Sequence, residues 1–232
     1  MVFNPKIEKT TRRIELKCVY TQRNLTSLEK LLYTSDHSFY EPYLPRYINS
    51  LYFDTPNLDC VAESYSGASV RTKIRFRWYG KLQNSTSSTL ELKKKQGQVS
   101  WKILIKEGIS INSRASNWNQ FFNPSWHEIL TLFKDLPLHC HPTSIVRYRR
   151  KYFVSADGLI RITLDEDLQF YNQLNSNGPN LIIADYSDAS IIAEIKVSDS
   201  NSHLLPKISN YISFTPRRFS KYCESISKKE RV

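Results

Sequence analysis

The chain has 232 residues, of which 40% are hydrophobic and 12% aromatic, so it can fill a core and a largely disordered chain is excluded. Its 33 Lys and Arg outnumber its 22 Asp and Glu, and the formal net charge of +11 indicates an anionic partner such as nucleic acid, a lipid headgroup or polyphosphate. The alternative is a generally basic, soluble surface. This length suits one large domain, and we expect a single domain over residues 1–232.

The cysteines and the hydropathy pattern bear on the compartment. Cys18, Cys60, Cys140 and Cys223 are widely spaced and form no C-x-x-C motif, which predicts reduced, mostly buried thiols rather than a disulfide framework. No stretch approaches the ~18 apolar residues of a membrane span, and residues 1–8 do not resemble a signal peptide. We therefore expect a soluble, cytoplasmic chain without membrane insertion.

Strands are expected in eight segments that alternate charged with apolar side chains or are rich in β-forming residues. In chain order these are residues 13–18, 46–53, 73–80, 90–95, 99–106, 145–155, 159–170 and 191–197. Turn residues predict two hairpins, one at Gln96-Gly97-Gln98 and one at Ala156-Asp157-Gly158. Leucine and aromatic spacing predicts helices at residues 24–33, 57–63, 116–132, 204–212 and 219–226.

This element order favours a β-dominated (α+β) architecture. About eight strands with several flanking helices suit a closed antiparallel β-barrel that holds a ligand. No repeat of fixed period and no linker divides the chain.

Basic side chains recur on the polar faces of strands that lie far apart in the sequence. Residues 71–77 show this most clearly, because Arg71, Lys73, Arg75 and Arg77 alternate with apolar or neutral residues. The same content recurs in Glu15 and Lys17, Glu91 and Lys93, Arg161, and Glu194 and Lys196. For any one strand the ordinary explanation is a face turned to water. If the sheet closes with these faces inward, the interior is a polycation that requires a bound polyanion or water.

A run of phosphates would suit such an interior, since Arg can bind two phosphate oxygens at once. Glu15, Glu91 and Glu194 suit Mg²⁺ or Mn²⁺, which carboxylates hold together with substrate phosphates. The alternative for each is a salt bridge that separates the basic residues. The run His139-Cys140-His141 is more typical of a structural loop than of a metal site. Neither a P-loop nor a G-x-G-x-x-G turn is present.

Five short motifs follow one another along the chain. They are KIRFRWYG at residues 73–80, LELK at 90–93, RITLD at 161–165, AEIK at 193–196 and FSKYC at 219–223. With the strand through Lys17 they cover nearly the whole chain, and in this order they resemble the vacuolar transporter chaperone (VTC) domain. The resemblance implies a triphosphate tunnel fold, an antiparallel barrel whose basic interior binds nucleoside triphosphate and polyphosphate with a divalent metal. It also implies polymerisation of inorganic polyphosphate from ATP.

The resemblance also implies roles for individual residues. The implied phosphate ligands are Lys17, Arg75, Arg77, Lys93, Lys102, Arg150, Arg161 and Lys221, and the implied metal ligand is Glu194. Arg147 and Arg149 are alternatives to Arg150, and Lys106 is an alternative to Lys102. Lys73 and Lys196 join the expected phosphate cradle, and Glu15 and Glu91 join the expected metal ligands. We expect Arg75, Arg77, Arg150, Arg161 and Glu194 to act on the transferred phosphate.

The expected reaction needs no protein nucleophile, because a terminal oxygen of the polyphosphate chain attacks the γ-phosphate of ATP. The related CYTH-type triphosphatases begin with two carboxylates before the Lys, whereas Arg13, Glu15 and Lys17 stand here and disfavour a hydrolase. A metal-dependent triphosphatase and a non-catalytic polyphosphate-binding module remain alternatives. We expect no nucleic acid partner, because Trp78 and Trp101 alternate away from the basic residues.

Overall fold

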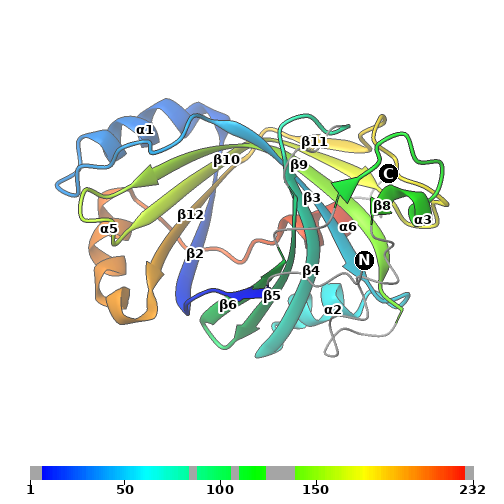
Figure 1. Ribbon diagram of the computed structural model, residues 1–232. Helices are drawn as coiled ribbons and strands as arrows, with labels where there is room; N and C mark the ends of the chain where they lie inside the picture. The colour runs from blue at the N-terminus through cyan, green and yellow to red at the C-terminus, as the bar shows by residue number, and fades with distance from the viewer. Residues whose placement is uncertain (1–6, 84–87, 106–109, 124–138, 228–232) are drawn as a thin grey trace.

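The computed structural model describes residues 7–83, 88–105, 110–123 and 139–227 (Figure 1). Its main strands are β2 (Arg13–Tyr20), β3 (Arg46–Asp54), β4 (Val70–Tyr79), β5 (Ser88–Gln96), β6 (Val99–Ile105), β9 (His141–Val154), β10 (Arg161–Asn172) and β12 (Ile191–Ser198). They pair antiparallel in the order β6-β2-β12-β10-β9-β3-β4-β5, and β5 pairs again with β6. The sheet is therefore a closed antiparallel barrel of eight strands, as the sequence predicted.

Shorter elements surround the barrel. In chain order they are β1 (Ile7–Lys9), a 3₁₀ turn (Gln22–Asn24), α1 (Leu25–Tyr33), α2 (Asp59–Ser66), β7 (Ser110–Ile111), α3 (Trp118–Phe121), β8 (Phe122–Asn123), β11 (Tyr186–Asp188), a 3₁₀ helix (Asp199–Leu204), α5 (Leu205–Tyr211) and α6 (Lys221–Ser227). Figure 1 shows α1 and α5 on one side of the barrel and α2 and α6 on the other. None of the described helices is long and apolar enough to cross a membrane.

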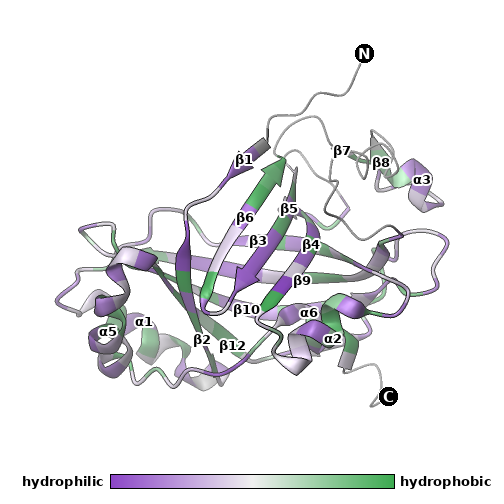
Figure 2. Cartoon of the chain, turned by 90° about the horizontal axis from the view of Figure 1, so that it is seen from below, coloured by the Kyte–Doolittle hydropathy of each residue, from purple (hydrophilic) through white to green (hydrophobic). Residues whose placement is uncertain are grey.

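The period-two alternation of the strands decides which side chains pack outside the barrel. On the α1 and α5 side, Ile162 and Ile195 are fully buried against Leu32 and Ile208. Figure 2 shows hydrophilic and hydrophobic bands alternating along the barrel strands. The apolar faces thus lie under helices, and the charged faces turn inward.

A second apolar cluster covers the outer face of β4. Ile74, Phe76 and Trp78 are fully buried there, together with Phe121 and Phe122. The indole Nε1 of Trp78 donates a hydrogen bond of 3.1 Å to the Leu82 carbonyl, so its polar atom is satisfied inside the cluster. The prediction that Trp78 packs in the apolar shell is confirmed, and this ring is not accessible for stacking on a nucleic acid base.

The predicted helix at residues 116–132 is confirmed over one turn only in the part that the structure describes. Only Trp118–Phe121 is helical, and Phe122–Asn123 is the extended strand β8, which pairs with β7. Because Phe121 and Phe122 both enter the cluster next to β4, an extended residue after one helical turn suits their burial. Residues 124–132 lie outside the described residues.

Other differences are small. The strand predicted from residue 145 already begins at His141, and β10 continues to Asn172. The short strands β1, β7, β8 and β11 were not predicted, because two or three residues carry too little alternation to be recognised. All four cysteines are free and buried, as expected.

Candidate phosphate-binding tunnel

The inner faces of the barrel enclose a cavity of about 1170 Å³. Among the described residues that line it, sixteen are Lys or Arg and three are Glu. Every predicted phosphate ligand lines this cavity, namely Lys17, Lys73, Arg75, Arg77, Lys93, Lys102, Arg150, Arg161, Lys196 and Lys221. The barrel therefore brings these ten predicted ligands together from seven strands and the start of α6.

One group of cations shares the carboxylate of Glu91 on β5. The guanidinium of Arg75 donates to Glu91 Oε2 at 2.8 and 2.5 Å, and Lys102 Nζ donates to the same oxygen at 2.9 Å. Arg77 Nη1 lies 3.2 Å from Glu91 Oε1. Burial alone would raise the pKa of Glu91, but the attraction of Arg75, Arg77 and Lys102 outweighs it and lowers the pKa well below its usual range. We call these four residues the Glu91 cluster.

A second group is held by Asp165, whose side chain is fully buried on β10. Arg150 donates from Nε to Oδ1 at 2.5 Å and from Nη2 to Oδ2 at 2.7 Å. Lys221 Nζ, at the start of α6, donates to the same Oδ2 at 2.5 Å. Burial would raise the pKa of Asp165, but Arg150 and Lys221 outweigh it and lower the pKa. We call these three residues the Asp165 cluster.

Asp165 was not singled out from the sequence, although it ends the RITLD motif. The alternation of the strand could have found it, because Arg161, Thr163 and Asp165 are alternate residues of β10 and therefore share its inward face. A single acidic residue on an otherwise basic face predicts ion pairs that hold the neighbouring cations in place. Asp165 is thus a positioning residue for Arg150 and Lys221.

Glu15 and Glu194 occupy the part of the wall formed by β2 and β12. Glu15 lies directly across from Lys196, and Glu194 lies across from Lys17, so the two carboxylates are diagonal neighbours. Glu15 accepts from Arg13 at 2.7 Å and from Lys93, whereas Glu194 is ion-paired with Lys196 at 3.0 Å. Burial would raise the pKa of Glu15, but the attraction of Lys93, with that of Arg13 and Lys196, lowers it to about 2.

The three predicted metal ligands do not form one site. Glu91 belongs to its own cluster with three cations, whereas Glu15 and Glu194 are neighbours. Within residues 7–83, 88–105, 110–123 and 139–227, no group of three or more His, Cys, Asp or Glu has metal-binding geometry. This covers His139, Cys140 and His141, of which Cys140 is buried and His141 begins β9.

Some tunnel cations have no carboxylate partner. Lys73 Nζ donates to Ser220 Oγ at 2.7 Å but forms no ion pair with a described residue, and neither does Arg161. Burial, together with the nearby charges of Lys17 and Lys93, lowers the pKa of Lys73 to about 8. These side chains keep unused capacity to bind an anion. We call Lys73 and Arg161 the unanchored cations.

The segment at residues 216–220 lines the cavity before α6 begins and crosses between β2 and α6 in Figure 1. The Arg217 amide donates to the Lys17 carbonyl at 2.7 Å, and Lys17 Nζ donates to the Phe219 carbonyl at 3.2 Å. At Gly67, which ends α2 with a φ of 74°, a Cβ atom would approach Arg218 Nη1 to 2.8 Å. The positive φ favours glycine at this helix end, whereas the Arg218 guanidinium, as the end of a flexible side chain, could move aside.

For two of the predicted phosphate ligands, Arg150 and Lys102, the sequence left neighbouring basic residues as alternatives. Arg150 lines the cavity, whereas its neighbour Arg149 alternates to the other face of β9 and pairs with Glu166 at 2.7 Å. Arg147 is likewise turned away, with its guanidinium 4.0 Å from the centre of the Tyr47 ring. Lys102 lines the cavity, and its alternative Lys106 lies outside the described residues.

Tyr148 was also missed, although it has the same parity on β9 as Arg150. Its hydroxyl accepts from Arg77 Nη2 at 3.2 Å, and Lys221 Nζ lies 4.7 Å from the ring centre. Burial would raise the pKa of Tyr148, but Arg77 and Arg150 outweigh it and lower the pKa to about 8. This phenol therefore connects the Glu91 and Asp165 clusters.

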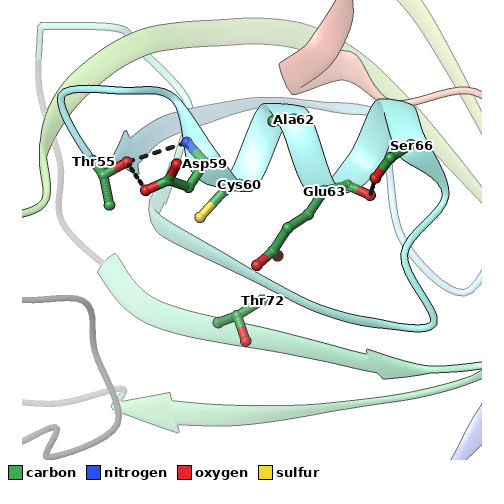
Figure 3. Close-up of a pocket in the computed structure, with 7 residues that line it drawn as sticks. All are labelled: Thr55, Asp59, Cys60, Ala62, Glu63, Ser66 and Thr72. Atoms are coloured by element: carbon green, nitrogen blue, oxygen red, sulfur yellow. Dashed lines mark hydrogen bonds between the residues drawn. The ribbon is translucent and has the colours of Figure 1, made fainter.

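A separate hollow of about 600 Å³ lies between α2 and β4 (Figure 3). It is lined by neutral residues with Asp59 and Glu63, and none of the described lining residues is basic. Thr55 Oγ1 donates to Asp59 Oδ2 at 2.6 Å and accepts from the Asp59 amide at 3.1 Å, which fixes the start of α2 (Figure 3). The chemistry of this hollow does not suit phosphate.

The comparisons with known proteins agree with this geometry. The model of the VTC domain matches residues 12–229, so the chain belongs to the VTC domain family. No curated protein matches the chain. The barrel has the CYTH-like triphosphate tunnel fold, which solved structures of low sequence identity share.

Two solved structures illustrate this likeness. A "putative adenylate cyclase" from Bacillus halodurans superposes with a TM-score of 0.56 at 14% identity, covering 91% of this chain and 95% of that one. A "putative adenylyl cyclase" from Hippeastrum, described as having a dominant triphosphatase activity, gives a TM-score of 0.52 at 18% identity and covers 94% and 96% of the two chains. At these identities the likeness establishes the fold and not the reaction.

Proposed function

We propose that this chain transfers the γ-phosphate of ATP to the end of a growing inorganic polyphosphate chain inside the tunnel, with Mg²⁺ or Mn²⁺. The observation that carries the proposal is the excess of sixteen basic residues over three glutamates, namely Glu15, Glu194 and Glu224, in the lining of one cavity. Like charges in a confined space repel strongly, and a ligand with many negative charges relieves that repulsion. A polyphosphate chain carries about one such charge on each phosphate.

The two clusters supply preorganised donors for such a ligand. Because Glu91 and Asp165 fix their guanidinium groups, Arg75, Arg77 and Arg150 lose little freedom when phosphate oxygens bind. The Arg77 Nε–H is buried and has no hydrogen-bond partner among the described residues, so one donor remains available. These arginines and Arg161 are the groups that we assign to the charge on the transferred phosphate.

The phosphate passes directly from ATP to the polyphosphate chain, without a covalent enzyme intermediate. A terminal oxygen of the polyphosphate chain forms a bond to the γ-phosphorus while the bond to the β–γ bridging oxygen breaks, which releases ADP and lengthens the chain by one phosphate. Lys17, Lys93, Lys102 and Lys221 would bind the donor and the product, and Lys73 and Lys196 would extend this cradle. The arginines would neutralise the charge that develops on the leaving oxygen.

The carboxylates present on β2 and β12 fit a divalent cation. Glu194 is buried, lines the cavity and is ion-paired only with Lys196 among the described residues, and Glu15 is its diagonal neighbour. Mg²⁺ commonly uses one or two carboxylates together with substrate phosphates, so Glu194 would suffice, alone or with Glu15 once Glu15 gives up a contact to Arg13 or Lys93. A bound cation would supply neutralisation of phosphate charge. Glu91 is a weaker candidate because three cations already occupy its oxygens.

A triphosphatase is the second candidate, and the adjacent Glu15 and Glu194 favour it because a carboxylate pair can orient water toward a bound triphosphate. Incubation with ATP and either metal, followed by separation of the products, tests both candidates. A ladder of polyphosphate supports the polymerase, orthophosphate alone supports the triphosphatase, and ATP binding without products supports a binding module. Action in the cytoplasm stays a prediction.

Arg161→Ala should abolish turnover and weaken polyphosphate binding, because it removes a cation that we assign to the transferred phosphate. The variant should still fold, because Arg161 has no carboxylate partner among the described residues that its removal would leave unpaired. Arg149→Ala is the matched control, since Arg149 belongs to the same basic sheet but pairs with Glu166 outside the cavity. Full synthesis by Arg161→Ala would contradict the role assigned to Arg161.

A further inference from the structure

Tyrosine rings gather around Arg46 in one part of the cavity wall. The guanidinium carbon of Arg46 lies 4.4 Å from the ring centre of Tyr79, 5.1 Å from that of Tyr152 and 5.4 Å from that of Tyr43. Arg46 Nε also donates to the Tyr152 hydroxyl at 3.3 Å, and the rings of Tyr43 and Tyr152 meet edge to face at 5.6 Å. We call these four residues the tyrosine cluster.

The cluster borders the cavity and remains accessible. All four residues line the same cavity as the phosphate cradle. Tyr43 is 58% exposed and Arg46 is also exposed, so aromatic and guanidinium surface faces the cavity and the solvent. Contacts within the cluster fix the orientation of Tyr43. A fixed, exposed ring can stack on a planar ligand at little entropic cost.

The position of the cluster relative to the cradle follows from strand register. Arg46 on β3 lies directly across from Arg150 on β9, which belongs to the Asp165 cluster. Tyr152 on β9 lies across from Thr163 on β10, which in turn lies across from Glu194 on β12. Two strand spacings, about 10 Å, therefore separate Tyr152 from Glu194. A ribose and its first phosphates can cover that separation.

We infer that the tyrosine cluster is the binding site for the base of a nucleoside triphosphate whose phosphates extend into the basic cradle. This inference rests on the proposed function and deepens it by assigning the nucleoside end of the donor. The base stacks on Tyr43 and on the flat guanidinium of Arg46, since every base has a π-face and arginine adds a cation–π attraction. Stacking of this kind discriminates little between bases, so adenine and guanine nucleotides bind with similar affinity.

Binding measurements on the full chain can separate the base from the phosphates. Calorimetric titration with ATP, GTP and tripolyphosphate, without divalent metal so that turnover does not interfere, gives the affinity for each ligand. Tyr43→Ala should weaken ATP and GTP binding by about tenfold, because stacking on an aromatic ring contributes on that scale. Its affinity for tripolyphosphate should stay within about twofold of wild type.

Two variants complete the test. Tyr43→Phe keeps the ring and should restore nucleotide binding, whereas Leu44→Ala removes the neighbouring side chain, which is 87% exposed and does not line the cavity, and should bind all three ligands as wild type does. Equal weakening of ATP and tripolyphosphate by Tyr43→Ala would overturn the inference and assign the ring a structural role. Unchanged ATP binding would overturn it as well. Failure of the wild type to bind tripolyphosphate would instead contradict the proposed function itself.

Discussion

Arg75 and Arg150 each meet a carboxylate inside the tunnel, whereas Lys73 and Arg161 form no ion pair with any described residue. The first two are held by buried partners that offset the desolvation of the guanidinium groups. For Lys73 no carboxylate offsets the desolvation, and burial together with neighbouring cations lowers its pKa to about 8.

This difference indicates that the anchored and the unanchored cations have different roles in the tunnel. Anchored arginines are rigid before any ligand arrives, which suits the precise stabilisation of a reacting phosphate. The unanchored cations gain a partner only when an anion binds, so they contribute more to affinity than to the stability of the empty barrel. Substitutions in the two groups should therefore have opposite effects on the free energy of unfolding.

The largest effect should come from Asp165→Asn, which leaves the buried Arg150 and Lys221 without their carboxylate. We expect the free energy of unfolding to fall by about 3–5 kcal/mol in urea titrations, the usual cost of breaking a buried ion pair. Glu166→Gln is the control, because Glu166 pairs with the partly exposed Arg149 outside the tunnel and should cost about 1 kcal/mol or less. Equal losses in both variants would contradict the anchoring role assigned to Asp165.

Tripolyphosphate should stabilise the wild-type chain by binding the folded state alone. At a concentration of 100 times its dissociation constant, the free energy of unfolding should rise by about 2.7 kcal/mol. The same titration at high salt should show a smaller rise, because salt screens the exposed part of the attraction. A stabilisation that did not depend on salt would indicate that the unanchored cations take no part in binding.

Lys73→Met should raise the free energy of unfolding of the empty protein by roughly 1 kcal/mol, because it removes a buried charge that has no carboxylate partner. The same substitution should weaken tripolyphosphate binding by about tenfold, the loss of one charged contact. Urea unfolding and calorimetry on one preparation would give both values. A less stable variant with unchanged affinity would reverse our assignment of Lys73.

The smallest effect concerns pH. The pKa of Lys73 in the empty tunnel is about 8, and a bound anion favours its charged form, so binding takes up a proton near this pH. Affinity for tripolyphosphate should therefore fall as the pH rises from 7 to 9. The ligand titrates in the same way with the wild type and with Lys73→Arg, so the difference between their affinities at each pH reports on residue 73 alone. The affinity of Lys73→Arg should depend less on pH, because arginine stays charged. Parallel profiles would exclude Lys73 as the titrating group.

The sequence by itself determined the eight strands and the basic faces. Alternation along residues 71–77 is enough to place Arg75 and Arg77 on one face and Trp78 on the other, because successive side chains of a strand point in opposite directions. The outer packing of Trp78 and the inner position of both arginines follow from that rule. Family resemblance supplied the expectation that the basic face is the inner one.

Tertiary structure alone decided which charged side chains meet. Glu91 and Glu194 each lie on the charged face of a strand and were both predicted as metal ligands, but they face different cations because their strands lie apart in the barrel. The roles of Asp165 and of the tyrosine cluster likewise depend on contacts between strands far apart in sequence. Alternation determines the face of each residue within its strand, whereas strand order and register determine its neighbours across the tunnel.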